Sequence, residues 1–302
     1  MNDDDALEFT GERFTPECVR EIWYEHWHRY VFARGFSAGK RVLDAACGEG
    51  YGSALLADNA AEVTGVDVDQ ASIAHARARY ASKPRLRYEC ADATALPYAD
   101  GAFDLVVSFE TLEHLLAQAQ LLAGFARVLA DDGVLLISSP DKRTYGELAG
   151  FRNEFHVREL YREELLELLQ PHFAHIRLYA QKLLFQSVLW ALDSPAGQAE
   201  VATAAQGDGA TAAGFDYAPM YYIAVCSRQP LPDTLPALSL FGDREESLYT
   251  HYNHEIRKNM SAGMRIAELE AEVKQLQARV PMTPIQDIAP QRREWRWWRR
   301  NR

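Results

Sequence analysis

Runs of apolar residues alternate with segments of helical periodicity along the first three quarters of the chain. Each run is short and nearly continuous, as expected for a strand that is buried on both faces of a parallel sheet. The predicted strands are residues 42–46, 62–66, 85–90, 103–108, 133–138, 173–180 and 220–227. The predicted helices between them are residues 53–57, 70–80, 115–129 and 157–169. This order predicts an α/β fold with a seven-stranded, mostly parallel sheet, whose last two strands pair as a hairpin.

Two segments flank or interrupt this pattern. Near the N-terminus, Trp23, Trp27, Tyr30 and Val31 recur at helical spacing, which predicts a helix that packs on the domain. Between the last two strands, residues 193–214 are rich in alanine, glycine and glutamine and contain few apolar side chains that could anchor them. We expect this insertion to be a mobile loop and assign it no function.

The first strand runs directly into a turn that contains Gly48, Gly50 and Gly52. Glycines at such a turn let the backbone pass close to a ligand, although tight turns also use glycine for purely steric reasons. Asp67 ends the second strand, where a carboxylate can hold the two hydroxyl groups of a ribose. The turn lacks the third glycine of the dinucleotide-binding fingerprint, so a pyrophosphate is disfavoured as the ligand.

Four motifs in this order resemble those of class I S-adenosylmethionine (SAM) dependent methyltransferases. The motifs are residues 42–50, 65–67, 90–93 and 103–108, within a resemblance that extends over about residues 8–227. The resemblance implies a Rossmann-like fold that binds SAM, with Asp67 on the ribose and Asp92 on the adenine amino group. The cofactor-binding residues that it implies are Asp44, Ala46, Gly48, Gly50, Asp67, Val68, Asp92 and Ala93. An aspartate after a strand can also cap a turn or a helix, so that alternative stays open for Asp92.

A second resemblance lies before the sheet. Residues 11–14 and 26–30 are similar to an N-terminal signature of bacterial methyltransferases associated with surface-polysaccharide synthesis. In that resemblance the segment closes over the cofactor. It implies that Arg13 or Arg29 meets the methionine carboxylate of SAM.

Glu110, Glu113 and His114 follow the fourth strand, and His156 follows the fifth. On a helix, their spacing of i, i+3 and i+4 would place the first three on one face, at the sheet edge where ligands bind. The set resembles the metal site of ubiquinone-pathway and small-RNA 2′-O-methyltransferases, which implies Mg²⁺ or another divalent ion on all four residues. We predict catalytic roles for His156, His114 and Glu110. In the alternative, no metal binds, and His156 acts alone as a base or caps the following helix.

Composition narrows the choice of function. The 302 residues are 48% hydrophobic and carry a net charge of −11, which suits one α/β domain with appendages and argues against nucleic acid as a partner. No apolar run reaches the roughly 18 residues of a membrane span, and the acidic N-terminus is unlike a signal peptide. We therefore expect a cytoplasmic protein. The four dispersed cysteines predict reduced thiols.

The last quarter of the chain has a different character. Residues 229–250 are rich in proline and are predicted to be a linker. Residues 251–280 are predicted to be a helix, in which a heptad seam over 266–280 predicts a short coiled coil and a homo-oligomer, or else a single helix packed on its own domain. In the tail, 281–302, six arginines and three tryptophans within 292–302 suit peripheral contact with the anionic inner face of the cytoplasmic membrane. The alternative is a disordered tail that binds polyanions weakly.

These patterns divide the chain into a cap over the active site (1–40), a methyltransferase domain (41–228) and the C-terminal extension. We predict a SAM-dependent O-methyltransferase that acts on a sugar hydroxyl of a bacterial surface polysaccharide or its lipid-linked precursor. A sugar hydroxyl is a poor nucleophile near pH 7 unless a base or a metal ion assists it. The alternatives are methylation of a small phenol or quinone, and a SAM-binding assembly subunit without catalysis.

Overall fold

The computed structural model describes residues 21–150, 153–189, 200–204 and 211–279. They belong to two compact units, Met1–Glu245 and Glu246–Arg302. Arg13 and the basic aromatic tail at 292–302 lie outside the described residues.

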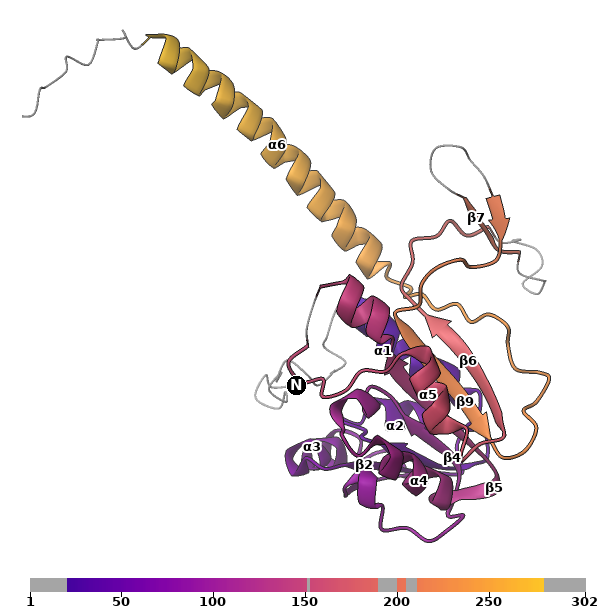
Figure 1. Cartoon of the computed structure of the whole chain (residues 1–302). Coiled ribbons are helices and arrows are strands. Elements are labelled where there is room, and N and C mark those ends of the chain that lie inside the picture. The colour runs from indigo at the N-terminus through magenta and orange to yellow at the C-terminus, as the bar shows by residue number, and fades with distance from the viewer. Residues whose placement is uncertain (1–20, 151–152, 190–199, 205–210, 280–302) are drawn as a thin grey trace, which may run out of the picture. The chain divides into compact units, whose positions relative to one another are not determined.

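A seven-stranded sheet forms the centre of the first unit and confirms the predicted fold (Figure 1). In spatial order the strands are β3 (Leu86–Cys90), β2 (Glu62–Asp67), β1 (Arg41–Ala45), β4 (Phe103–Ser108), β5 (Leu129–Pro140), β9 (Tyr221–Ser227) and β6 (His175–Gln181). The pairings from β3 to β5 are parallel, and β9 runs antiparallel to both β5 and β6. The strand order reverses between β1 and β4, so a ligand-binding crevice is expected at their carboxyl ends.

Helices cover both faces of this sheet, and the alternation of side chains along each strand assigns residues to one face or the other. Leu43, Val106 and Leu135 belong to the cluster that includes α4 (Gln118–Val128) and α5 (Arg162–Leu169). Val42, Leu105 and Leu136 belong to the cluster that includes α1 (Glu21–Arg34) and α2 (Tyr51–Leu56). Helix α3 (Gln70–Arg79) packs on β3 through Ile73 and Ala76. The central strands are therefore buried on both faces, as their continuous apolar runs predicted.

Helix α1 packs on the domain, as predicted. Tyr30 is buried in the core, and Trp23 and Trp27 pack against the same cluster. The absence of a side chain at Gly52 permits this contact, because a Cβ there would lie 2.1 Å from the ring of Tyr30. The aromatic stripe thus holds the helix to the glycine turn after β1.

Some predicted boundaries are wrong. Within the insertion, which was expected to be a mobile loop, β7 (Ala202–Ala204) and β8 (Thr211–Ala213) form a two-stranded antiparallel sheet. Helix α5 begins at Arg162 instead of residue 157, and α4 begins at Gln118 instead of 115. In both cases the residues before the helix form loops of the sheet edge, whose shape is set by contacts with other segments.

Residues 229–245, within the segment predicted as a linker, pack against the rest of the first unit. The ring of Phe241 lies 5.5 Å from that of Trp23 and 5.5 Å from that of His28. Ser239 Oγ lies 2.9 Å from His28 Nε2, and Tyr179 Oη donates to the carbonyl oxygen of Pro236 at 2.9 Å. This segment therefore covers the outer side of α1.

The second unit contains the long helix α6 (Ser247–Arg279), which begins four residues earlier than predicted. Across the described residues, the structure contains no helix that combines the length and the apolar character needed to cross a membrane.

Candidate active site

The chain turns sharply between β1 and α2. Ala46 (φ 60°), Gly48 (φ 54°) and Gly50 (φ 94°) all have left-handed backbone conformations, which L side chains disfavour. A Cβ at Gly50 would lie 2.7 Å from the ring of Tyr88, and Tyr88 Oη donates to the carbonyl oxygen of Gly50 at 2.6 Å. The shape of the turn therefore requires glycine at position 50 for two reasons, backbone conformation and close packing.

Asp67 lies beside this turn at the end of β2. Its Oδ2 accepts a hydrogen bond from the Gly48 backbone N–H at 2.8 Å, and its Oδ1 accepts one from that of Asp69 at 2.9 Å. The next residue, Val68, is 74% exposed. The carboxylate is thus fixed by backbone donors at the ligand-binding edge, which fits the predicted contact with the ribose of SAM.

Asp92 follows β3 and caps a short 3₁₀ helix, η2 (Ala93–Ala95). Its Oδ1 accepts hydrogen bonds from the backbone N–H of Thr94 at 2.8 Å and from Thr94 Oγ1 at 2.7 Å. Asp92 is therefore a cap, as one alternative held. The adenine contact stays a prediction, because capping uses only one of the two carboxylate oxygens.

Asp44, predicted as a cofactor ligand, is fully buried and is held by protein groups. Its Oδ1 accepts a hydrogen bond from Tyr30 Oη at 3.0 Å, and its Oδ2 accepts one from Ser53 Oγ at 2.6 Å. Burial raises the pKa of Asp44 to about 6, although both hydroxyl groups oppose the rise. The geometry gives this carboxylate a structural task, which is to join α1, β1 and α2 around the glycine turn.

Glu110 leaves β4 in a left-handed conformation with φ 50°. The expected helical face through Glu110, Glu113 and His114 is therefore wrong. Ser138 of β5 stabilises the turn, because its Oγ accepts from the Glu110 N–H at 2.8 Å and donates to Glu110 Oε1 at 2.7 Å. Arg29 Nη1 lies 3.2 Å from the same Oε1. Glu110 thus binds the cap helix to the sheet edge.

Arg29 is only 2% exposed, so protein groups and not water stabilise its positive charge. Its Nε donates to Gln181 Oε1 at 2.7 Å, and its Cζ lies 4.3 Å from the ring centre of Tyr221. Burial opposes the charge of the guanidinium, but Glu110, Tyr221 and Glu25 outweigh burial and raise its pKa. Nη1 and Nη2 make no directed hydrogen bond to any residue in the described part of the chain. Nη1 is ion-paired with Glu110, so the predicted contact with the methionine carboxylate of SAM would use Nη2.

Glu25, one helical turn before Arg29, belongs to the same buried group. Its burial raises its pKa to about 7, which the charge of Arg29 opposes. Sequence reasoning missed Glu25 because the polar side of α1 was not expected to be covered. The i, i+4 spacing of Glu25 and Arg29 was the available signal.

Glu113, His114 and His156 come together at the same edge. One potential ligand atom from each lies within 4.8 Å of the others. Three of the four predicted metal ligands therefore form a group, and Glu110 is not part of it. Two backbone hydrogen bonds close this loop: the N–H groups of Val157 and Arg158 donate to the carbonyl oxygen of Glu113 at 2.8 and 2.9 Å.

Both imidazoles of this group are oriented through Nδ1. His156 Nδ1 lies 2.6 Å from Glu159 Oε1, and His114 Nδ1 lies 3.0 Å from the carbonyl oxygen of Phe155. Tyr145, from the π-helical turn η4 (Lys142–Leu148), stacks on His156 with ring centres 5.2 Å apart. This arrangement directs Nε2 of each ring away from its Nδ1 partner. Sequence reasoning missed Glu159, although its i, i+3 spacing from His156 could have indicated it.

Glu113 is the carboxylic acid of this group, and its surroundings shift its pKa. It is 1% exposed, and neither carboxylate oxygen has a hydrogen-bond partner among the residues described here. Burial, together with the charge of Glu110, raises the pKa of Glu113 well above its usual value. His114 Nε2 lies 3.8 Å from Glu113 Oε1, beyond hydrogen-bond distance. A buried carboxyl group without a hydrogen bond beside two oriented imidazoles fits a divalent cation, because a cation would compensate the buried charge.

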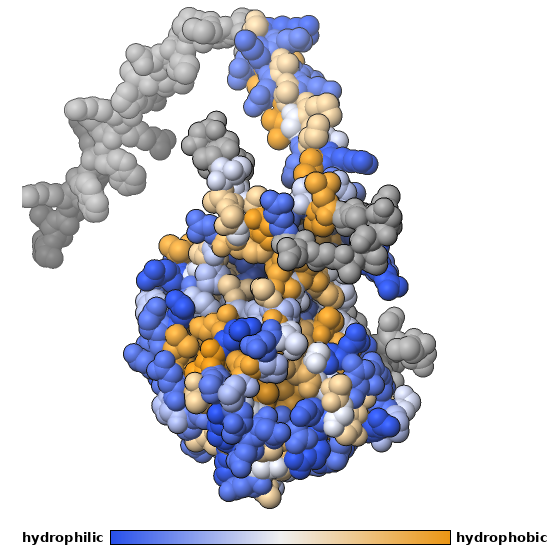
Figure 2. Space-filling view, turned by 90° about the vertical axis from the view of Figure 1, so that its right-hand side faces the viewer, coloured by the Kyte–Doolittle hydropathy of each residue, from blue (hydrophilic) through white to orange (hydrophobic). Residues whose placement is uncertain are grey.

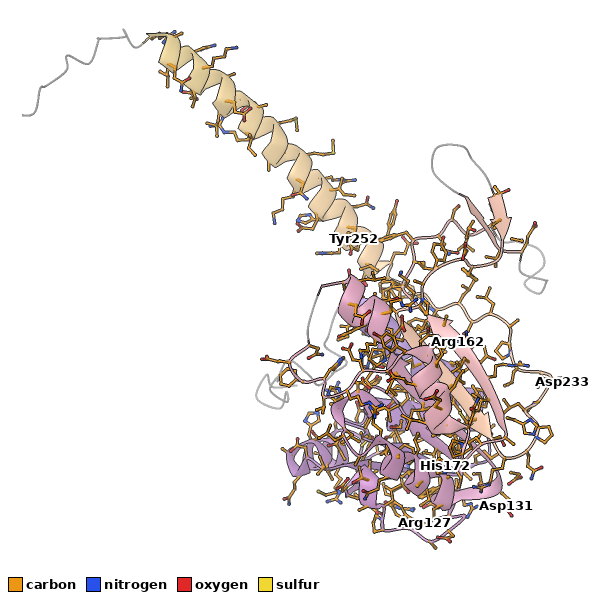
Figure 3. The ribbon with its side chains drawn as sticks, viewed as in Figure 1. Arg127, Asp131, Arg162, His172, Asp233 and Tyr252 are labelled. Atoms are coloured by element: carbon orange, nitrogen blue, oxygen red, sulfur yellow. The ribbon has the colours of Figure 1, made fainter. Side chains whose placement is uncertain are left out.

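At the opposite end of the sheet, the residues that the structure describes form no comparable site. Arg127 and Asp131, labelled in Figure 3 near the start of β5, line a shallow hollow together with Arg228. Arg127 and Arg228 both donate to backbone carbonyl oxygens there. Their donors serve to hold loops together, so the chemistry-bearing residues lie at the carboxyl edge.

Comparison with known proteins agrees with this location. Residues 43–137 match the model of a family described as a methyltransferase domain. A SAM-dependent methyltransferase of Mycolicibacterium smegmatis is 43% identical over 168 residues, which cover 55% of this chain and 64% of the relative. A demethylmenaquinone methyltransferase of Beutenbergia cavernae is 35% identical over 129 residues, which cover 41% of this chain and 52% of the relative. The chain thus covers less than two thirds of either relative.

Among solved structures, the methyltransferase in complex with the Trm112 activator of Haloferax volcanii aligns with a TM-score of 0.50. The alignment covers 67% of this chain and 90% of that one, and at 18% identity it shows a shared fold. The ordered motifs, the seven-stranded sheet and the family match over residues 43–137 show a methyltransferase domain with the class I, Rossmann-like fold.

Proposed function

We propose that the chain transfers the methyl group of SAM to a sugar hydroxyl of a bacterial surface polysaccharide or its lipid-linked precursor. The observation that carries the O-methyl assignment is the short contact between His156 Nδ1 and Glu159 Oε1 at the ligand-binding edge. A carboxylate on Nδ1 favours the tautomer whose Nε2 is a proton acceptor, and it stabilises the imidazolium that forms.

His156 is the proposed general base. A sugar hydroxyl must lose its proton as it attacks the methyl group, and positioned general bases contribute about 10²–10⁴-fold in rate. His156 Nε2 takes that proton, while Glu159 holds the ring in place. Tyr145 stacks on the same ring and fixes its plane. His114, whose ring centre lies 5.0 Å from that of His156, completes the polar side of the site.

A divalent cation is the alternative way to activate the hydroxyl group, because a His156 Nε2 that ligates a metal cannot also accept a proton. Glu113, His114 and His156 would hold it, and when bound it would lower the pKa of the acceptor hydroxyl. Two imidazoles and one carboxylate suit Mn²⁺, Fe²⁺ or Zn²⁺ better than Mg²⁺, which prefers oxygen ligands.

Two sequence features that take no part in methyl transfer support a glycan as the acceptor. His26, Arg29 and Tyr30 belong to the N-terminal signature that resembles polysaccharide-associated methyltransferases, and Arg29 and Tyr30 join the cap to the site. The arginine- and tryptophan-rich tail would bring the enzyme to a membrane that carries lipid-linked acceptors. That placement on the inner face of the cytoplasmic membrane belongs to this proposal.

A second candidate is methylation of a quinone or phenol. The similarity to a protein named as a demethylmenaquinone methyltransferase favours it. A phenol ionises near pH 10, far more easily than a sugar hydroxyl, so this reaction would depend less on His156.

The test is transfer of labelled methyl from SAM to extracted lipid-linked glycan, with catechols and quinols as competing acceptors. His156→Gln should lower transfer to glycan by about 10²–10⁴-fold, the usual contribution of a general base. His172→Gln is the matched control, since His172 follows α5 and does not belong to the group of Glu113, His114 and His156. Label on quinols alone would favour the second candidate, and SAM binding without label on any acceptor would favour a non-catalytic subunit.

The metal is tested in the same assay. A chelator should lower the rate, and Mn²⁺ should restore it. An unchanged rate after chelation would refute the metal while leaving His156 as the base.

A further inference from the structure

The second unit carries an apolar surface that methyl transfer does not use. Helix α6 spans 33 residues, and from Ile256 onward its large apolar side chains are exposed to solvent. Ile266, Leu269, Val273 and Leu276 are between 42% and 56% exposed and lie along one side of the helix. Figure 2 shows apolar side chains along this helix with hydrophilic ones on either side. A stripe of this kind normally packs against a partner.

The types of residue in the stripe indicate how many helices pack together. With Ile266 at heptad position a, the a positions are Asn259, Ile266 and Val273, and the d positions are Ala262, Leu269 and Leu276. β-branched residues at a with leucine at d favour two parallel strands. A single asparagine at a specifies the same state, because in a parallel dimer it pairs with its own copy in an otherwise apolar seam.

The charges beside the seam indicate the orientation of the partner. Arg265 occupies position g, and Glu270 occupies the e position that faces g of the other helix in a parallel coiled coil. The two side chains are opposite in charge, so each dimer would contain this pair twice. Within one chain Arg265 already contacts Glu268 at 2.9 Å, an exposed pair that is easily exchanged for one across the seam. A second copy of this helix therefore complements the stripe in both shape and charge.

We propose that residues 259–279 form a parallel, in-register, two-stranded coiled coil with a second copy of this chain. The occupant of the apolar stripe is thus the same segment of another molecule. This inference is independent of the acceptor and of the methyl-transfer chemistry.

Sedimentation equilibrium of the full chain is the first test, over roughly a hundredfold range of concentration because the dimer follows mass action. The wild type should approach twice the chain mass of 34.1 kDa. Leu269→Lys at a d position should give the monomer mass. Met264→Lys is the matched control, because Met264 is 63% exposed and lies at position f, away from the seam. A monomeric wild type, or equal loss of dimer in both variants, would overturn the proposal.

Charge exchange tests the orientation. Arg265→Glu and Glu270→Arg should each weaken the dimer alone, because each places like charges opposite one another. An equal mixture of the two variants should regain wild-type association through two attractive pairs. If the mixture associates no better than either variant alone, the parallel register is wrong. Asn259→Val should convert a pure dimer into a mixture that contains larger oligomers, and an unchanged pure dimer would remove Asn259 from the account.

Discussion

Replacing Gly50 by alanine tests the physical basis of the turn that is predicted to bind SAM. The new Cβ would lie 2.7 Å from the Tyr88 ring and 2.8 Å from the Cβ of Ala76, both in the core. Gly50 also has φ +94°, where an L residue is strained. Gly39 is the matched control, because it too has a positive φ of +69°, yet a Cβ there would meet nothing within 4 Å.

The expected magnitudes follow from this contrast. A left-handed alanine costs about 1–2 kcal/mol at either position. Steric overpacking against Tyr88 and Ala76 adds about 1–3 kcal/mol at Gly50 only. Alanine also lowers the conformational entropy of the unfolded chain, which reduces the loss of stability by the same amount in both variants. This term therefore cancels when the two variants are compared. Gly50→Ala should therefore be less stable than Gly39→Ala by about 1–3 kcal/mol.

Urea unfolding of the full chain, followed by circular dichroism, measures this difference. SAM binding measured by calorimetry should weaken in Gly50→Ala and stay unchanged in Gly39→Ala, because only the first displaces the turn. Equal free energies of unfolding in the two variants would refute the packing argument. Unchanged SAM affinity in Gly50→Ala would separate the turn from the cofactor site.

Two further predictions concern the buried charges beneath the cap. Burial raises the pKa of Asp44 from 3.8 to about 6, so the protonated form stabilises the fold below pH 3.8 and that stability is lost as the pH rises through about 6. Asp44→Asn should not show this loss in the free energy of unfolding, which is on the order of 3 kcal/mol between pH 3.8 and about 6. A difference in stability between this variant and the wild type that does not vary with pH would contradict the prediction. Arg29→Met should destabilise the fold by about 3–5 kcal/mol because it leaves Glu110 without its cation, and Arg29→Met/Glu110→Gln should recover part of that loss in a double-mutant cycle. Strictly additive effects would show that the two residues do not interact.

The sheet could be predicted from the sequence because its strands are specified locally. Val42 and Leu43 point to opposite faces, yet both are apolar, and that pattern is possible only for a strand covered on both sides. The ordered motifs then placed Asp67 and Asp92 at the carboxyl edge, where the structure has them. The seven strands of the main sheet, and the edge at which Asp67 and Asp92 lie, followed from these patterns.

The shape of the loops could not be predicted, because distant residues determine it. Glu110 adopts φ 50° since Ser138, on another strand, holds both its backbone and its carboxylate. The segment after β9 looked like a linker by its prolines, but Phe241 packs against Trp23. Each error has one cause, a tertiary contact that no local pattern encodes.

The central claim is that SAM binds at the carboxyl ends of β1, β2 and β3 with its ribose on Asp67. Titration calorimetry with SAM and with its demethylated product tests it most directly. Asp67→Asn keeps an acceptor for only one of the two backbone N–H groups and loses the charge, so affinity should fall by at least about tenfold. Asp58→Asn is the control, because Asp58 is exposed and pairs with Lys83 away from the turn. The predicted result is that the wild type and Asp58→Asn bind SAM with measurable heat, and that Asp67→Asn binds at least about tenfold more weakly. An absence of heat in the wild type, or equal affinity in all three proteins, would contradict the account.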